Sequence, residues 1–368
     1  MYKPTPNQVF LNLGHGKFKD ISAECGIRAH PGKGMGIGVA DFDLDGRMDL
    51  FIANDKVYNS FFRNVSGTDG VKFKEVAFDV NVALRENGEL ISNMGVDFRD
   101  LDNDGYPDIA VVALDHETFP IFKNTGKGEF ADFTRASNVD ALSLSMAGYS
   151  PLIRDFYNDG WKDIFVTRGH VQSLLAAPRI AAEQNNTVFR NLGGARFAAL
   201  TAEAGLTGRP PGRHRGSAVG DFDGDGRLDV VVTQIGGLAE IWLNKSPGNN
   251  HWLELSLRGT KSNRDGIGAR VKVVTSAMTQ YDHESTAGGY ASSSAGPLHF
   301  GLGAHASADV VEIHWPSSII QKLTNVAGDR ILTVQEPPDR RPRTTSRRAV
   351  GRKYLRRLGS ALAPGDER

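Results

Sequence analysis

The chain has 368 residues, 40% of them hydrophobic and 23% charged, and its formal net charge at pH 7 is zero. This is a globular composition with room for two domains, and it provides no overall basic field for binding nucleic acid. The single cysteine, Cys25, excludes an internal disulfide and is expected to be buried. No apolar run approaches the roughly 20 residues that cross a bilayer, and MYKPTPNQVF lacks the apolar core of a signal peptide.

An internal repeat begins at the N-terminus. Its first element consists of two short apolar strands separated by an Asn and a Gly-rich turn, as in VFLNLGHGKFKDIS. The Asn and the Gly are expected to supply the positive backbone angles of a hairpin turn. The element occurs at 9–22, 61–77, 121–134 and 188–201, with a partial copy at 241–249.

The second repeated element is an aspartate-rich loop. It reads DFDLDGRMD at 41–49, DLDNDGYPD at 100–108, DFYNDGWKD at 155–163 and DFDGDGRLD at 221–229, at intervals of 59, 55 and 66 residues. Each copy runs into a short apolar segment (LFIAN, IAVVA, IFVTR or VVVTQ) that is typical of a buried strand.

Together the two elements predict a unit of four short strands, repeated four times, with no helical pattern. Units of this kind bury their apolar faces only against neighbouring units, and four strands per unit favour the blades of a β-propeller. The array begins and ends with equivalent strands at 9–12 and 241–244. One repeat could therefore be shared between the two ends, which would close the ring and remove its open edges.

The repeat stops after residue 247. Alternating strands such as WLELSLRG and ARVKVVTS predict a second, sandwich-like β domain over residues 248–336, so that the propeller occupies 1–247. The remainder, 337–368, is predicted to be a disordered basic tail, since residues 339–368 contain ten Lys or Arg and three Asp or Glu. Such a tail could bind an anionic surface, although the sequence indicates no specific nucleic acid partner.

The aspartate loops predict sites for a hard cation. Each offers side-chain oxygens at positions 1, 3, 5 and 9, a backbone carbonyl at position 7 and a Gly at position 6. Calcium suits such loops because it accepts six to eight oxygen ligands in flexible geometry. The candidate ligands are Asp41, Asp43, Asp45, Arg47 and Asp49; Asp100, Asp102, Asp104, Tyr106 and Asp108; Asp155, Asp159, Trp161 and Asp163; and Asp221, Asp223, Asp225, Arg227 and Asp229.

Two alternatives to this interpretation were weighed. An EF-hand requires Glu at position 12 of the loop, where this sequence has Ile or Val in all four copies. A purely acidic turn without metal would suffer repulsion between its carboxylates. The third loop is weaker because Tyr157 replaces the carboxylate at position 3, so the sequence predicts three to four calcium sites.

Glycines also occur in GKGMGIG at 32–38, which superficially suggests a nucleotide-binding loop. No helix pattern follows, so we expect these glycines to pack where strands approach each other near the propeller axis.

The repeats resemble the FG-GAP/VCBS calcium-loop repeats of integrin α-chain propellers and of many bacterial surface proteins. Three further segments, NNHWLELSLRGTKSNRDGIGARVKV, GGYASSSAGPLHFGLG and VVEIHWPSSIIQKLTNVAGDRILTV, resemble the ASPIC/UnbV domain of cartilage-acidic-protein-like chains. The resemblance covers essentially residues 1–336. It implies a calcium-binding propeller followed by a small β domain, usually in an exported protein with more repeats. We therefore expect an extracellular or cell-surface location, and self-association if four repeats leave the ring incomplete.

Two classes of function follow from these patterns. The first is a non-enzymatic, calcium-stabilised propeller that binds a protein or glycan ligand, as in adhesion. The alternative is a hydrolase or lyase with its site in the propeller mouth or in a cleft between the domains, which would require a convergent acid–base pair. No catalytic residue is expected, because most of the clustered carboxylates belong to the metal loops.

Overall fold

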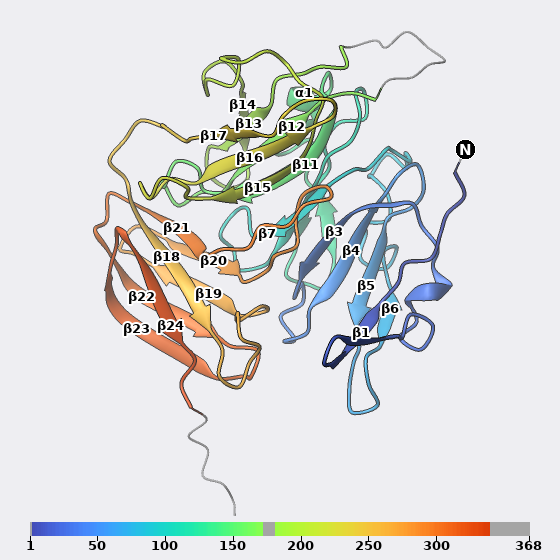
Figure 1. Cartoon of the computed structure of the whole chain (residues 1–368), viewed down its shortest axis with the longest axis horizontal. Coiled ribbons are helices and arrows are strands. Elements are labelled where there is room, and N and C mark those ends of the chain that lie inside the picture. Colours follow the sequence, from blue (N-terminus) through green and yellow to red (C-terminus); the bar gives the residue numbers. More distant parts are fainter. Residues whose placement is uncertain (1, 172–180, 339–368) are drawn as a thin grey trace, which may run out of the picture. The chain divides into compact units, whose positions relative to one another are not determined.

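The computed structural model describes residues 2–171 and 181–338. The chain divides into two compact units, Met1–Pro337 and Pro338–Arg368. The tail predicted at 337–368 lies, from residue 339 onward, outside the described residues. The first unit is built from β-sheets, as the sequence predicted, with a 3-10 turn η1 (Ile27–Ala29) and one short helix α1 (Val139–Ser143) (Figure 1).

Four antiparallel sheets follow one another along the chain, and we call them blades 1 to 4. Within each blade every strand is hydrogen-bonded to the strand that precedes or follows it in sequence. Their strands are β3 (Gly34–Ala40), β4 (Asp49–Asn54), β5 (Ser60–Asn64) and β6 (Phe73–Glu75) in blade 1; β7 (Val96–Arg99), β8 (Asp108–Val111), β9 (Ile121–Asn124) and β10 (Phe130–Asp132) in blade 2; β11 (Gly148–Arg154), β12 (Asp163–Arg168), β13 (Thr187–Asn191) and β14 (Phe197–Leu200) in blade 3; and β15 (His214–Gly220), β16 (Asp229–Gln234) and β17 (Glu240–Trp242) in blade 4.

Neighbouring blades pack through their first strands and through shared apolar cores. β7 contacts both β3 and β11, and β11 contacts β15. Buried side chains from adjacent blades form one cluster between blades 1 and 2, around Phe51 and Phe98, and others between blades 2 and 3 and between blades 3 and 4. These shared cores are the propeller-blade packing that the repeat predicted.

Glycines allow the first strands to approach each other closely. A Cβ atom on Gly36 would lie 2.7 Å from the backbone oxygen of Met94, and one on Gly95 would lie 2.2 Å from that of Tyr149. Neither position has room for a larger residue. The close contact at Gly36 fits the prediction that glycines of GKGMGIG pack where strands approach each other, and their position near a propeller axis stays a prediction.

The predicted sharing of one repeat between the two ends is not formed in the described part of the chain. β1 (Phe10–Gly14) pairs with β2 (Lys17–Asp20) in a separate two-stranded sheet, whereas β17 pairs with β16 at the edge of blade 4. The hairpin β1–β2 is exposed along its whole length, and the side chains of Phe10 and Phe18 are 54% and 62% exposed. The two equivalent strands therefore lie in different sheets.

Residues 251–335 form two further sheets, which we call the C-terminal sheets. One has the order β21 (Leu298–Gly303), β18 (His251–Arg258), β24 (Arg330–Gln335), and the other β20 (Thr279–His283), β19 (Arg270–Val274), β22 (Ser307–His314), β23 (Ile320–Ala327). Their apolar faces enclose one core that includes Leu255, Val271 and Trp315.

The segment 284–296, between β20 and β21, inserts among the first strands of the blades (Figure 1). The N–H of Gly289 donates to the carbonyl of Val96 (2.7 Å), and the N–H of Tyr290 donates to Oγ of Ser150 (3.1 Å). Further along, Ser292 and Ser294 accept N–H groups of β15. A loop of the C-terminal sheets thus supplies hydrogen-bond partners to strands whose edges face the propeller centre.

Candidate metal centres

Each aspartate loop joins the first and second strands of its blade, and the carboxylate at position 1 organises the turn. In blade 1, Asp41 accepts the N–H of Asp45 at Oδ1 and the N–H of Gly46 at Oδ2, both at 2.9 Å. The position-1 to position-6 bond recurs in the other three loops at 2.7–2.8 Å. The position-6 glycines all have positive φ, between 81° and 93°, which explains why this position is Gly.

The position-9 carboxylate ties the loop to the third strand of the blade. Oδ1 of Asp49 accepts the N–H of Asn64 (2.7 Å), and its Oδ2 accepts the N–H of Phe42 (3.2 Å). The same pair of bonds is made by Asp108, Asp163 and Asp229. Position 9 therefore has a structural role besides any binding of metal.

The repeated asparagine does not supply the positive backbone angle that the sequence predicted. Glycines of these turns, such as Gly126 and Gly193, have positive φ, as do His15 and Ala195, whereas the repeated asparagines do not. The asparagine side chain instead forms a bridge. Its Oδ1 accepts the N–H two residues later, and its Nδ2 donates to the carbonyl at position 8 of the loop.

Three of the loops bring three carboxylates together closely enough to share one ion. Within the described residues these groups are Asp41, Asp43 and Asp45; Asp100, Asp102 and Asp108; and Asp221, Asp223 and Asp225, with candidate ligand oxygens within 4.8 Å of one another. Oδ1 of Asp43 and Oδ1 of Asp102 are buried and accept no hydrogen bond. Buried oxygens without donors fit a hard cation, because a metal would supply the missing positive charge.

The loop 155–163 does not form such a group within the described residues. Tyr157 at position 3 packs its ring under the guanidinium of Arg190 at 4.4 Å instead of offering an oxygen. Oδ1 of the neighbouring Asn158 accepts a hydrogen bond from Nε2 of His299 (2.7 Å). A Cβ on Gly301 would lie 2.1 Å from Oδ2 of Asp155, so β21 covers this loop closely. Three sites is the number that the geometry supports.

The position-7 side chains cover the adjacent hairpins. Nε of Arg47 donates to the carbonyl of Asn64 (2.7 Å), and Arg227 does the same to Asn244 (2.9 Å). Each arginine also pairs with the position-5 aspartate of its own loop. That the backbone carbonyl of position 7 binds metal stays a prediction.

Protein cations lie beside the acidic loops, and the sequence interpretation overlooked them. Arg63 pairs with Asp43 (2.5 Å) and Lys123 pairs with Asp102. In blade 4, Nζ of Lys245 lies 2.5 Å from Asp223 and 2.8 Å from Asp225. The basic residue beside the repeated Asn, in FRN, FKN and LNK, was the signal that could have revealed them.

Burial makes the charged form of the loop carboxylates costly. It raises the pKa of Asp49 to about 7 and that of Asp100 to about 6, and neighbouring carboxylates act in the same direction. For Asp108, burial together with Asp100 and Asp102 raises the pKa well above its usual range. A divalent cation would stabilise the ionised forms and so lower these pKa values.

The repeated blades and acidic loops define a class of protein, the β-propellers with acidic-loop repeats, and the sequence comparisons agree. Residues 2–52, 41–111, 100–166 and 172–232 match the FG-GAP-like repeat, and residues 259–341 match the ASPIC and UnbV domain. This chain belongs to the FG-GAP-like repeat family and carries a C-terminal ASPIC and UnbV domain, as the sequence resemblance implied.

Individual relatives are more distant. Cartilage acidic protein 1 of Homo sapiens is 27% identical over 345 residues, covering 91% of this chain and 49% of the human protein. The Xenopus tropicalis protein of the same name is 28% identical over 322 residues, covering 84% of this chain and 46% of its own length. The chain thus spans about half the length of the curated relatives that it matches.

Among solved structures, an Agrocybe aegerita lectin is similar, with a TM-score of 0.40 and 20% identity over 66% of this chain and 58% of the lectin. That lectin specifically recognises non-reducing terminal N-acetylglucosamine.

Proposed function

We propose that this chain is a calcium-binding, non-enzymatic propeller module that binds a protein or glycan ligand. The observation that carries the proposal is the set of three carboxylate triads, two of which contain buried oxygens without a hydrogen-bond donor. Calcium would complete these loops and stiffen the blade edges on which they lie. The bound ion would supply charge neutralisation, while Asp41, Asp100 and Asp221 hold the turns in shape through their backbone hydrogen bonds.

An extracellular location is part of the proposal. Calcium loops of extracellular modules bind with dissociation constants of about 10⁻⁴–10⁻³ M, so they are filled outside the cell and empty at cytosolic calcium levels. Within the described residues, no helix is long and apolar enough to cross a membrane.

The proposal is tested by thermal unfolding of the full chain in EDTA and in millimolar calcium. Calcium at one to ten times its dissociation constant adds about 0.4–1.4 kcal/mol per independent site, so three sites should raise the midpoint by several degrees. Asp43→Asn and Asp102→Asn should each reduce the calcium-dependent rise, because each removes the negative charge of a carboxylate with a buried, unsatisfied oxygen.

Asp159→Asn is the matched control. It removes one carboxylate from the loop that lacks a triad, so the calcium-dependent rise should equal that of the wild type. Equal midpoints in EDTA and calcium would contradict the proposal. An equal response to magnesium would contradict the choice of calcium.

A further inference from the structure

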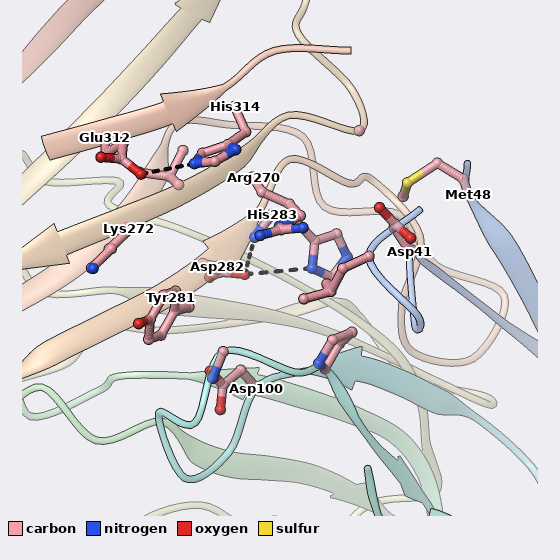
Figure 2. Close-up of a pocket in the computed structure, with 15 residues that line it drawn as sticks. Asp41, Met48, Asp100, Arg270, Lys272, Tyr281, Asp282, His283, Glu312 and His314 are labelled. Carbon is pink, nitrogen blue, oxygen red and sulfur yellow. Dashed lines mark hydrogen bonds and ion pairs between the residues drawn. The ribbon is translucent and has the colours of Figure 1, made fainter. Parts of the chain in front are cut away.

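A cavity lies between the acidic loops and the C-terminal sheets, and the proposed binding of calcium assigns no role to it. It has a volume of about 240 Å³. One wall consists of the loops of blades 1 and 2, with Asp41 and Asp100, and the other is the face of β19, β20 and β22 (Figure 2). It thus lies where the propeller and the C-terminal sheets meet.

Strand register creates the second wall. Arg270 on β19 lies opposite His283 on β20 and His314 on β22. Two residues along, Lys272 lies opposite Tyr281 and Glu312. Because alternate residues of a strand share a face, these two rows present their side chains to the same cavity. Figure 2 shows Arg270 and Lys272 on this sheet wall, across from the acidic loops.

Neither cation of this wall makes a direct ion pair, because Arg270 attracts Asp41, and Lys272 attracts Glu312, only at longer range. Within the described residues, the Arg270 guanidinium and the Lys272 ammonium make no hydrogen bond or ion pair, although both side chains are half-buried. Their acidic neighbours have other partners, since Glu312 pairs with His314 (2.8 Å) and Asp282 pairs with Arg99 (2.5 Å). The Lys272 ammonium also lies 5.8 Å from the centre of the Tyr281 ring, a weak contact that leaves its charge unneutralised. Half-buried cations without a direct counter-ion favour an anionic ligand.

The rest of the lining restricts what that anion can be. The carboxylates of Glu312, Asp41 and Asp100 would repel a multiply charged phosphate, but they can accept hydrogen bonds from hydroxyl groups. Met48 and Pro107 add apolar surface. The volume lies below the roughly 300–1,000 Å³ of pockets for drug-sized ligands, and so suits a single ring.

We propose that this cavity binds a monosaccharide-sized sugar acid, with Arg270 and Lys272 contacting its carboxylate and Glu312 accepting a hydrogen bond from its hydroxyl groups. The inference rests on the proposed binding function and gives it a ligand class, an acidic glycan unit. It does not require the calcium loops to hold the ligand themselves.

The test is a calorimetric titration of the full chain, at constant calcium, with sodium glucuronate. Glucose, which lacks the carboxylate, and inorganic sulfate, which lacks the sugar body, should each bind at least about tenfold more weakly. Arg270→Gln and Lys272→Gln should each lower glucuronate affinity about tenfold, as expected for loss of one charged hydrogen bond. Lys272→Arg, which keeps the charge, should restore binding to within about threefold of the wild type.

Lys322→Gln is the matched control, because Lys322 lies opposite Glu312 on β23, one strand beyond the cavity lining. It removes the same charge and should change affinity less than twofold. The proposal is overturned if glucuronate does not bind, or if its affinity is unchanged in both glutamine variants. It is also overturned if sulfate binds as tightly as glucuronate. If the calcium-dependent rise in midpoint persists without glucuronate binding, only this inference fails; if that rise is absent, the proposed function fails.

Discussion

The buried carboxylate of Glu336 is stabilised by a concentration of hydrogen-bond donors. Its Oε2 accepts the N–H groups of Thr260, Lys261 and Ser262 at 2.7–2.8 Å, and its Oε1 accepts the hydroxyls of Ser262 and Ser317. Burial alone would raise the pKa of Glu336, but these donors outweigh it and lower the pKa to about 2. This one residue joins the end of β24 to the loop after β18.

Glu336→Gln should destabilise the protein by about 2 kcal/mol at pH 7, because an amide places its own donor against these N–H groups. The folded pKa lies below the ordinary value of about 4.3, so the carboxylate stabilises the fold fully above that pH and less as the pH falls towards 2. Thermal midpoints of variant and wild type at pH 7, 5 and 3 check this.

The difference between variant and wild type should shrink by roughly half between pH 7 and pH 3. Glu203→Gln, at an exposed position, is the control and should match the wild type throughout. A difference that is constant with pH would show that packing, and not the carboxylate's charge, is what matters.

At the scale of the structural element, the repeated asparagine links each blade to the one before it. Nδ2 of Asn124 donates to the carbonyl of Phe42 (2.9 Å), Asn191 to Leu101 (2.9 Å) and Asn244 to Phe156 (2.7 Å). The acceptor is in each case position 2 of the preceding aspartate loop. The hairpin and loop elements are therefore coupled between blades as well as within them.

This coupling predicts unequal effects for chemically identical substitutions. Asn191→Ala should cost about 3 kcal/mol, because it leaves buried carbonyls in two blades without donors. Asn64→Ala should cost only about 1 kcal/mol, since Asn64 donates to Met48 of its own loop and is itself half-exposed. Chemical denaturation of both variants measures the difference, and equal costs would rule out a significant inter-blade bond.

At the scale of the whole molecule, a buried ion pair joins the propeller to the C-terminal sheets. Nη1 of Arg99, on β7, donates to Oδ1 of Asp282 on β20 (2.5 Å) and to the carbonyl of His283 (3.1 Å). Burial alone would raise the pKa of Asp282, but Arg99 outweighs it and holds the pKa well below its usual range. Both side chains are about 3% exposed, so neither can be solvated if its partner is lost.

Arg99→Met should therefore lower stability by about 3–5 kcal/mol, because it leaves Asp282 as an unpaired buried charge. Adding Asp282→Leu should recover part of the loss. Arg28→Met, which removes an exposed pair with Asp20, is the control and should cost less than about 1 kcal/mol. Thermal midpoints of the four proteins are the measurement, and a double variant no more stable than Arg99→Met would contradict the argument.

The expected self-association also belongs to this scale and stays a prediction. The hairpin β1–β2 and the strand β17 both expose apolar side chains, among them Phe18 and Ile241. Exposed strand edges of this kind are available for pairing with further strands.

The repeat, the all-β class and the position of the acidic loops could be predicted from the sequence alone. These properties depend on local chemistry. A β-branched run favours a strand whatever surrounds it, and the glycine at position 6 is required by a positive φ within the loop itself. The spacing of Asp41, Asp43 and Asp45 likewise predicts a triad, because all three lie on one tight turn.

Other features depended on contacts between residues far apart in the sequence, and only the tertiary structure decided them. The bridging role of Asn191 and the insertion of segment 284–296 each require knowing which element packs against which. The cavity beside Arg270 is of the same kind, since its two walls come from loops and strands more than 160 residues apart. The local sequence pattern determines which strands form. Their unpaired edges and charges find partners only in the elements that the fold places beside them, and these elements are distant in the sequence.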